Sequence, residues 1–200
     1  MKKLPRSFYT QRTLTVAKEL LGKIFVHKIG TKYISGMIVE TEAYLFNDPA
    51  SHSFRGLTER NKPMFNNGGF LYVYFTYGMH YCANIVTYRE GIGEAVLIRA
   101  VEPIDGIEVM YANRKFRDDR HLKGDGHLHI LTNGPAKFAK AFSLTKIHTG
   151  IDLIGNEIFI TEGKSIPNSS IVKTTRIGIS SAIEKKWRFY VKGNEWISKK

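Results

Sequence analysis

The feature that most constrains the fold is a stretch of two short aromatic-rich runs that a Gly-Met pair separates, GFLYVYFTYGMHYCAN at residues 69–84. Runs of this composition around a glycine predict two antiparallel strands joined by a short turn. In such a strand Tyr72 and Tyr74 share one face because they are two positions apart, while Tyr77 lies at the turn. For any single aromatic residue, burial in the core is the commoner explanation. The stretch therefore predicts a hairpin with a bulky ring at its tip, and it leaves open which rings are core.

The size and charge of the chain narrow the function classes. Its 200 residues suit one domain, residues 1–200, large enough to bury a core without disulfides. The formal net charge is +12, and the lysines and arginines are spread along the chain rather than gathered in a tail. A basic folded surface favours polyanionic partners, nucleic acid above all, although such a charge also occurs in proteins that are merely soluble.

Cysteine usage and hydropathy exclude further classes. Cys82 is the single cysteine, so an intrachain disulfide, a four-cysteine zinc site and a cysteine-ligated iron–sulfur cluster are all excluded. The N-terminal segment MKKLPRSFYTQRTL has no apolar run after its lysines, and no apolar run of about 18 residues occurs elsewhere. We therefore expect a soluble, cytoplasmic protein without a membrane partner, associated with the nucleoid if the source is bacterial.

Apolar spacing predicts a mixture of helices and strands. Helical periodicity indicates helices from about Thr13, over residues 106–116 and from Pro135. Alternating and β-branched residues indicate strands over residues 23–28, 33–44, 151–160 and 171–180, with a last strand near the C-terminus. In the fourth of these, Gly178 suggests a bulge or a close approach to the backbone.

Charged residues in and after the second strand are candidates for a site. Glu40 and Glu42 point to the same face of an extended strand, and the polar loop that follows, residues 45–64, is too long to be an ordinary connection. Arg99 interrupts the apolar segment AVLIRAVEP and, if buried, needs a carboxylate or backbone oxygens as partners. Glu42 is one candidate partner, and an outward-facing Arg99 on an edge strand is the alternative.

Two further features suggest ligands. His121, His127 and His129 raise the question of a metal, but their spacing matches no helical zinc motif, and we expect no metal and no cofactor. Lys137, in the first turn of the helix that Pro135 begins, is a candidate phosphate contact, although the same pattern is simply a well-formed helix start.

A set of motifs in one order gives the chain a resemblance. It resembles the alkyladenine (3-methyladenine) DNA glycosylase family in GMIVETEAY, SHSFRG, RNKPMF, LYVYFTYGMHYCAN, AVLIRAVEP, NGPAKFAKAF, RIGIS and RFYVKGNEWIS. The resemblance implies an α+β fold in a single compact domain, with a curved, mainly antiparallel sheet, peripheral helices and a protruding hairpin that inserts into DNA. It also implies an enzyme, without metal or cofactor, that excises damaged purines flipped out of duplex DNA.

The resemblance carries over to single residues. It implies that Glu42 activates the attacking water and that Arg99 helps to hold that water. It implies a base pocket in which Tyr44, His52 and Tyr74 enclose the flipped base, Asn84 helps to exclude guanine and the backbone of Ile177 contacts the base. Tyr77 matches the side chain that fills the gap in the duplex, and we add Arg60 and Lys137 as candidate contacts to the DNA backbone. His80 replaces an expected aromatic residue, and the segment between Tyr44 and His52 is one residue shorter, which puts substrate breadth in doubt.

The chemistry of these residues fits base excision. An enzyme that acts on a base must extrude it from the duplex, and aromatic stacking offsets part of that cost. A carboxylate stabilises the positive charge that develops on the sugar and deprotonates the water. No lysine that could form a Schiff base is among the matched pocket residues, so we expect a monofunctional enzyme. We further expect a monomer that acts on damaged double-stranded DNA without an obligate protein partner. The open alternatives are a basic nucleic-acid-binding module without catalysis and a metal-dependent hydrolase.

Overall fold

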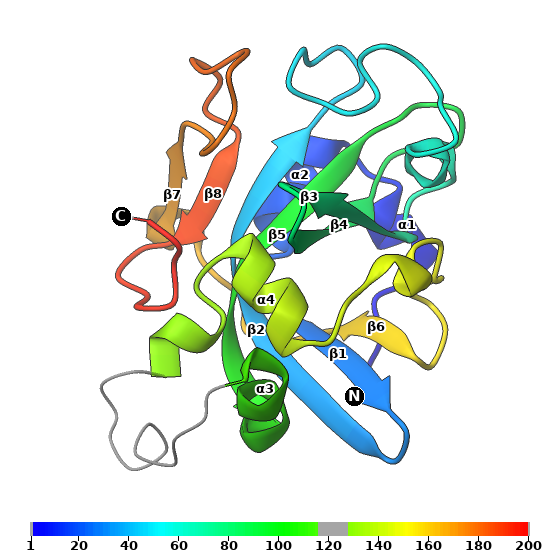
Figure 1. The fold of residues 1–200 in the computed structure, drawn as a ribbon. Helices are drawn as coiled ribbons and strands as arrows, with labels where there is room; N and C mark the ends of the chain where they lie inside the picture. The colour runs from blue at the N-terminus through cyan, green and yellow to red at the C-terminus, as the bar shows by residue number, and fades with distance from the viewer. Residues whose placement is uncertain (1, 116–127, 200) are drawn as a thin grey trace.

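A computed structural model describes residues 2–115 and 128–199, and within them eight strands form one sheet (Figure 1). All strand pairs are antiparallel, in the order β3-β4-β5-β2-β1-β6, and β8 pairs with both β2 and β7. The prediction of an α+β fold with a curved, mainly antiparallel sheet is confirmed. The strands are β1 (Ile24–Ile29), β2 (Lys32–Tyr44), β3 (Leu71–Thr76), β4 (His80–Val86), β5 (Ala95–Asp105), β6 (Ile158–Thr161), β7 (Ile171–Thr174) and β8 (Arg188–Val191).

Strand β2 is the centre of the sheet, and it has different neighbours at its two ends. From Ser35 to Tyr44 it pairs with β5, but on the other edge it pairs first with β1, from Lys32 to Met37, and then with β8, from Glu40 to Glu42. Residues 34–43 are all buried, as expected for a strand covered on both faces. The two acids that the sequence places near the end of this strand therefore lie inside the protein.

Short helices cover the sheet. In the view of Figure 1, α4 lies in front of the sheet and α2 lies behind it. The α-helices are α1 (Arg6–Tyr9), α2 (Thr13–Glu19), α3 (Ile107–Arg114) and α4 (Pro135–Ala141). Four single turns of 3₁₀-helix accompany them within the described residues: η1 (Lys62–Phe65), η3 (Leu128–Leu131), η4 (Lys146–His148) and η5 (Asn168–Ser170).

The three helices that the sequence predicts, α2, α3 and α4, begin within one residue of their predicted starts, whereas α1 was not predicted. Pro135 occupies the first position of α4, where its missing N–H costs no helical hydrogen bond. Phe138 and Phe142 point inward and meet Phe25 of β1 edge to face, with ring centroids 5.2 Å and 5.6 Å away. These rings belong to a continuous core that also contains the buried face of α2, so the helices are held by apolar packing.

Two of the predicted strands are wrong in extent. In residues 151–160 only β6 at the end is a strand; before it, Ile151 and Leu153 alternate with polar residues because they cover the core from a turn beside β3. In residues 171–180 the strand β7 ends at Thr174, and the following segment is irregular. Gly178 therefore lies in a loop, where its φ of +75° suits glycine, and not in a strand.

Strands β3 and β4 pair from Leu71 opposite Ile85 to Thr76 opposite His80. Between them Tyr77 and Gly78 both have positive φ, +51° and +66°, and the Met79 N–H donates to the Thr76 carbonyl. Two successive residues with positive φ define the type I′ turn, which suits the twist of a hairpin. Tyr77 is 79% exposed, and the protrusion of this hairpin from the body stays a prediction. Its insertion into DNA stays a prediction.

Among the described residues, no helix has the length and apolarity needed to cross a bilayer.

Candidate active site

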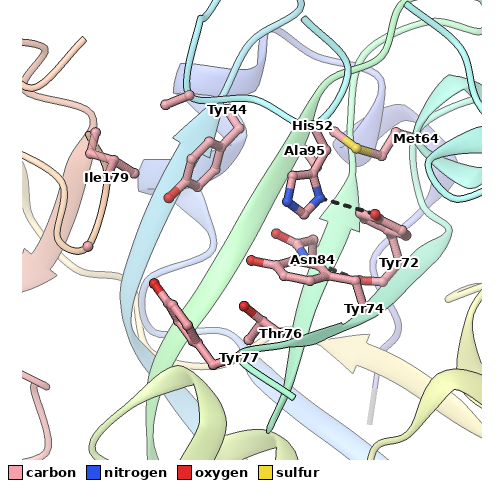
Figure 2. A pocket seen from close by; sticks show the side chains of 12 residues that line it. Tyr44, His52, Met64, Tyr72, Tyr74, Thr76, Tyr77, Asn84, Ala95 and Ile179 are labelled. Carbon is pink, nitrogen blue, oxygen red and sulfur yellow. Dashed lines mark hydrogen bonds between the residues drawn. The ribbon is translucent and has the colours of Figure 1, made fainter. Parts of the chain in front are cut away.

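A cavity of about 170 Å³ opens between the β3–β4 hairpin, the end of β2 and the loops at residues 45–65 and 175–180. Figure 2 shows Tyr44 on one side of this pocket and His52 with Tyr74 on the other, while Tyr77 stands at the mouth. The pocket therefore gathers side chains from four separate parts of the chain. Its lining residues are Tyr44, Ala50, His52, Met64, Tyr72, Tyr74, Thr76, Tyr77, Asn84, Ala95, Gly178 and Ile179.

Three rings from β3 and the neighbouring loop form one wall of the pocket. The His52 and Tyr74 rings meet edge to face, with centroids 4.4 Å apart, and His52 Nδ1 lies 3.1 Å from the hydroxyl of Tyr72. His52 is open to solvent at the pocket mouth, but the surrounding atoms desolvate its ring, and with the positive charge of Arg60 they lower its pKa. Burial raises the pKa of Tyr72 and Tyr74, so both phenols are neutral.

Tyr44 connects the opposite wall of the pocket to the buried acids. Its hydroxyl donates a 2.9 Å hydrogen bond to Glu42 Oε2, and burial, with the adjacent charge of Glu42, raises the pKa of Tyr44. The other carboxylate oxygen, Glu42 Oε1, accepts a 2.8 Å hydrogen bond from the Ile177 backbone N–H. Glu42 itself is completely buried. The carboxylate thus lies directly behind the pocket wall, held by Tyr44 on one side and the 175–180 loop on the other.

Glu42 belongs to a cluster of four charged side chains. Arg99 Nη1 lies 3.2 Å from Glu42 Oε2, the pair that the sequence suggests, and Arg99 Nε donates a 3.0 Å hydrogen bond to Glu40 Oε1. Arg188 Nε donates to the same Glu40 oxygen at 2.6 Å. Ser198 closes the cluster, because its N–H and its hydroxyl both donate to Glu40. Two buried carboxylates are therefore balanced by two buried guanidinium groups.

The sheet is irregular where this cluster forms. Along β2 and β5, Ile38 pairs with Val101, Glu40 with Ala100 and Thr41 with Ile98, so Arg99 has no partner in the ladder. Such irregularities redirect side chains and are common beside active sites. Burial by itself lowers the pKa of Arg99, but the charges of Glu42 and Glu40 outweigh it, and the net effect is a raised pKa.

A second buried ion pair supports Tyr44 from behind. The Arg176 guanidinium lies 4.7 Å from the centre of the Tyr44 ring and 5.2 Å from the Trp187 ring. Both Arg176 Nη atoms donate to the carboxylate of Asp48, and Nη1 also donates to the Ala43 carbonyl at 3.0 Å. The side chains of Arg176 and Asp48 are fully buried. This pair joins the two loops that border the pocket.

The long loop over residues 45–64 is internally braced, which its composition does not indicate. Asn61 is almost completely buried, accepts a 2.6 Å hydrogen bond from the Thr58 N–H and donates to the carbonyls of His52 and Gly56 at 2.8 Å and 2.9 Å. An amide that satisfies three backbone groups replaces the missing strand or helix pairing. The loop therefore presents His52 from a fixed frame.

The structure brings most of the predicted site residues to one place. Tyr44, His52, Tyr74, Tyr77 and Asn84 line the pocket, and Asn84 also donates a 3.2 Å hydrogen bond to the Tyr72 carbonyl of the paired strand. The predicted residues Glu42, Arg99 and Ile177 lie outside the pocket lining and are connected to it through Tyr44 and the 175–180 loop.

The two candidate contacts to the DNA backbone have different surroundings. Arg60 lies beside the hairpin, where its guanidinium is 5.8 Å from the Tyr74 ring centre and donates at 3.3 Å to the Phe75 carbonyl. Lys137 donates to Asn133 at 2.7 Å and lines a separate cavity of about 590 Å³ together with Met79 and His80 of the hairpin. Desolvation and the nearby charge of Arg114 lower the pKa of Lys137.

Several residues of the site escaped the sequence analysis. Tyr72, which the sequence assigns to the core or to support of the hairpin, is indeed buried in a small core cluster, but it also lines the pocket and contacts His52. Glu40, Arg188 and Ser198 were not predicted to meet Arg99, although the shared face of Glu40 and Glu42 on one strand was a usable signal. Of the three histidines considered for a metal, His121 and His127 lie outside the described residues, and His129 belongs to η3.

Comparison with known proteins identifies the family of the chain. The model of the family described as methylpurine-DNA glycosylase (MPG) matches residues 7–195. A protein of Carboxydothermus hydrogenoformans is 46% identical over 98% of this chain and 99% of its own length. One from Clostridium acetobutylicum is 46% identical over 98% and 97%, and one from Francisella tularensis subsp. tularensis (strain FSC 198) is 47% identical over 94% and 95%. Each of the three has the name "Putative 3-methyladenine DNA glycosylase".

A match to the family model over nearly the whole chain, together with relatives of this identity and coverage, establishes the family. The chain therefore belongs to the methylpurine-DNA glycosylase family of DNA-repair hydrolases, which act on N-glycosyl bonds.

Proposed function

We propose that this protein removes methylated purines of the 3-methyladenine class from double-stranded DNA and also accepts 7-methylguanine and hypoxanthine. In this reaction a water activated by Glu42 displaces the base and leaves an uncut abasic site, which begins base excision repair. The observation that carries the proposal is the hydrogen bond from Tyr44, a wall of the aromatic pocket, to the buried carboxylate of Glu42.

The pocket has the properties of a site for one flipped base. Its volume of about 170 Å³ is smaller than the roughly 300–1,000 Å³ typical of sites for drug-sized ligands, which suits a single heterocycle. Tyr44 on one side and His52 with Tyr74 on the other offer aromatic surfaces to both faces of the base. Stacking on such surfaces contributes about 1–3 kcal/mol per base and so offsets part of the cost of extrusion. Asn84, at the pocket wall, supplies a polar group that can discriminate between purines.

Glu42 is suited to two tasks in the reaction. Breakage of the glycosidic bond develops positive charge on the sugar, and a fixed carboxylate nearby stabilises that charge. The same carboxylate accepts a proton from the attacking water. Oε1 receives a hydrogen bond from the Ile177 N–H, and a carboxylate oxygen can accept a second one, so it retains capacity for a water. Because Glu42 is fully buried behind Tyr44, which stacks on the base, we propose that this water enters when the 175–180 loop is displaced.

Glu40 acts in this proposal through Arg99. One oxygen of Glu40 receives hydrogen bonds from Arg99, Arg188 and Ser198, which fixes the Arg99 guanidinium with Nη1 toward Glu42. The guanidinium in turn holds the Glu42 carboxylate and helps to hold the water. Glu40 is thus a positioning residue.

The hairpin and the basic surface hold the duplex. Tyr77 is the most exposed large ring of the hairpin and stands at the pocket mouth, as a side chain must if it fills the space that a flipped nucleotide leaves. Arg60 and Lys137 flank the hairpin from two sides, and we propose that both contact phosphates.

The leaving group sets the order of substrates. A purine methylated at N3 or N7 is cationic and departs without further protonation, whereas hypoxanthine is neutral and needs a proton donor. Among the residues that line the pocket there is no lysine that could form a Schiff base, which supports a monofunctional reaction.

The experiment that tests this proposal compares Glu42→Gln with Glu108→Gln, an exposed carboxylate of α3, as a matched control. Release of 3-methyladenine and 7-methylguanine from methylated duplex DNA, and of hypoxanthine from a defined duplex, is measured in single-turnover assays. General base catalysis contributes about 10²–10⁴-fold, so Glu42→Gln should lose at least that factor while still binding damaged duplex. Release at the wild-type rate would show that Glu42 is not the base.

The remaining parts of the proposal concern the state of the protein. We propose that residues 1–200 work as one domain and as a monomer, because the pocket and the charged cluster are built from one chain. Because the proposed substrate is DNA, we propose that the protein works at the nucleoid in the cytoplasm if the source is bacterial.

A further inference from the structure

A cluster of two histidines and a glutamate lies at a site that shares no lining residue with the base pocket. His27 of β1, His148 of η4 and Glu157, just before β6, have ligand atoms that all lie within 4.8 Å of one another. The three line a solvent-connected cavity of about 490 Å³. Nothing in base excision uses them, and they differ from the histidines that the sequence suggested for a metal.

His27 is held as metal-binding histidines usually are. Its Nδ1 lies 2.8 Å from the Phe142 carbonyl, which can only accept, so Nδ1 carries the proton and Nε2 presents a lone pair. The residue is only 4% exposed. The orientation of this ring is therefore fixed before any ion arrives.

His148 is oriented by the turn in which it lies. Its Nδ1 accepts a 3.0 Å hydrogen bond from the Thr145 N–H and also lies 3.3 Å from the Thr145 carbonyl. The tautomer with the proton on Nδ1 donates to that carbonyl and leaves Nε2 free for an ion. The change of tautomer leaves the Thr145 N–H without this acceptor, and the new hydrogen bond to the carbonyl together with the bond from Nε2 to the ion offsets that loss.

Two imidazoles and one carboxylate are the donors of many zinc sites that keep an open position. With metal–ligand bonds of about 2.1 Å, tetrahedral ligands are about 3.4 Å apart. The present separations of up to 4.8 Å therefore need a contraction, which the exposed side chain of Glu157 can supply by rotation. The two histidines come from different elements and already meet edge to face, with ring centroids 5.0 Å apart.

We propose that His27, His148 and Glu157 form a binding site for one Zn²⁺ ion, with water as the fourth ligand. The ion joins β1 and the start of β6 to η4. Thr149, the residue after η4, is hydrogen-bonded to β3. Its hydroxyl accepts a 3.1 Å hydrogen bond from the Val73 N–H and donates a 2.6 Å hydrogen bond to the Val73 carbonyl. Zinc thus stabilises the attachment of the strand that carries Tyr72 and Tyr74, and it takes no part in base excision.

Metal binding is measured on the untagged, EDTA-treated and desalted protein by calorimetric titration with ZnCl₂. The wild type should bind one ion per chain tightly. Loss of a residue that only supports a metal ligand typically weakens metal binding by about 10–100-fold. Loss of a ligand itself should therefore weaken zinc binding by more than about tenfold. We expect this loss in Glu157→Gln and His148→Gln, while His80→Gln, which changes an exposed histidine of the hairpin, should bind as the wild type does.

Two further measurements protect the test against misfolding of the variants. Glu157 is exposed, so Glu157→Gln should fold normally, and zinc should raise the unfolding temperature of the wild type but not of this variant. Co²⁺ in place of zinc should give the strong visible absorption of four-coordinate cobalt. The proposal is overturned by the absence of saturable binding, by equal affinity in Glu157→Gln and wild type, or by the weak spectrum of six-coordinate cobalt.

Discussion

Replacement of Asp48 by asparagine tests how the pocket wall is held. Asp48 accepts hydrogen bonds from both Nη atoms of Arg176, and both side chains are fully buried. The Arg176 guanidinium lies against the Tyr44 ring and hydrogen-bonds to the Ala43 carbonyl. The substitution Asp48→Asn would keep the shape of the side chain and one acceptor oxygen but remove the charge, so Arg176 would remain buried without a counter-ion.

The size of the effect follows from the burial. Removing one partner of a buried ion pair costs about 3–5 kcal/mol, because the remaining charge is uncompensated. This is a large share of the roughly 5–15 kcal/mol that stabilises a typical protein. At about 2–4 °C per kcal/mol for a chain of this length, the unfolding temperature should fall by about 6–20 °C.

The matched control is Asp152→Asn, because Asp152 pairs with Arg6 at 2.6 Å but both side chains are partly exposed, 44% and 28%. Exposed pairs contribute less than about 1 kcal/mol. Urea denaturation followed by circular dichroism measures both variants. A loss below about 1 kcal/mol in Asp48→Asn, or equal losses in the two variants, would refute the assignment of the pair as a buried support. The double variant with Arg176→Met should recover part of the stability, since no buried charge remains.

Three further predictions concern DNA. Tyr77→Ala should fold normally and lose most of its preference for damaged over undamaged duplex in a fluorescence-anisotropy assay, whereas Tyr77→Phe should keep it. An unchanged preference in the alanine variant would show that Tyr77 does not fill the gap that the flipped nucleotide leaves. Glu40→Gln should lower kcat for base release much more than it changes KM, measured at a temperature where the variant is folded, because Arg99 loses its anchor; a fall that only follows unfolding would leave Glu40 a purely structural residue. Binding should weaken steeply with salt, and Arg60→Ala or Lys137→Ala should each reduce the slope of log K against log salt by about 1; a flat salt response would contradict the phosphate contacts.

Local patterns were predictable where one segment decides its own structure. Pro135 begins α4, the apolar spacing after Thr13 gives α2, and two-residue alternation places Glu40 and Glu42 on one face of β2. The glycine after Tyr77 indicated a tight turn, which the structure shows as two residues with positive φ. These features depend on helical periodicity, strand alternation and backbone sterics, all of which act over a few residues.

The alternation of apolar and polar residues gave wrong strand predictions where it reflects burial in the core and not pairing in a sheet. Ile151 and Leu153 alternate with polar residues like a buried strand, yet they reach the core from a turn. Ile177 and Ile179 alternate with exposed residues, yet they lie in a loop, where Arg176 turns inward to Asp48 and the Ile177 N–H faces Glu42. Sequence alone does not distinguish a strand from a loop that covers a core.

The partners of the charged residues were decided only by the tertiary structure. A lone buried arginine such as Arg99 predicts that a carboxylate must lie near it, since an unpaired buried charge is costly. That it shares Glu40 with Arg188 and Ser198, and reaches Glu42 as well, depends on β8 replacing β1 as the neighbour of β2 and on the irregular pairing of β5. The sequence therefore determined which side chains need partners, and the fold determined which partners they have. Glu40 is separated from Arg99 by 59 positions in the chain and from Ser198 by 158, so these contacts depend on the packing of the whole chain.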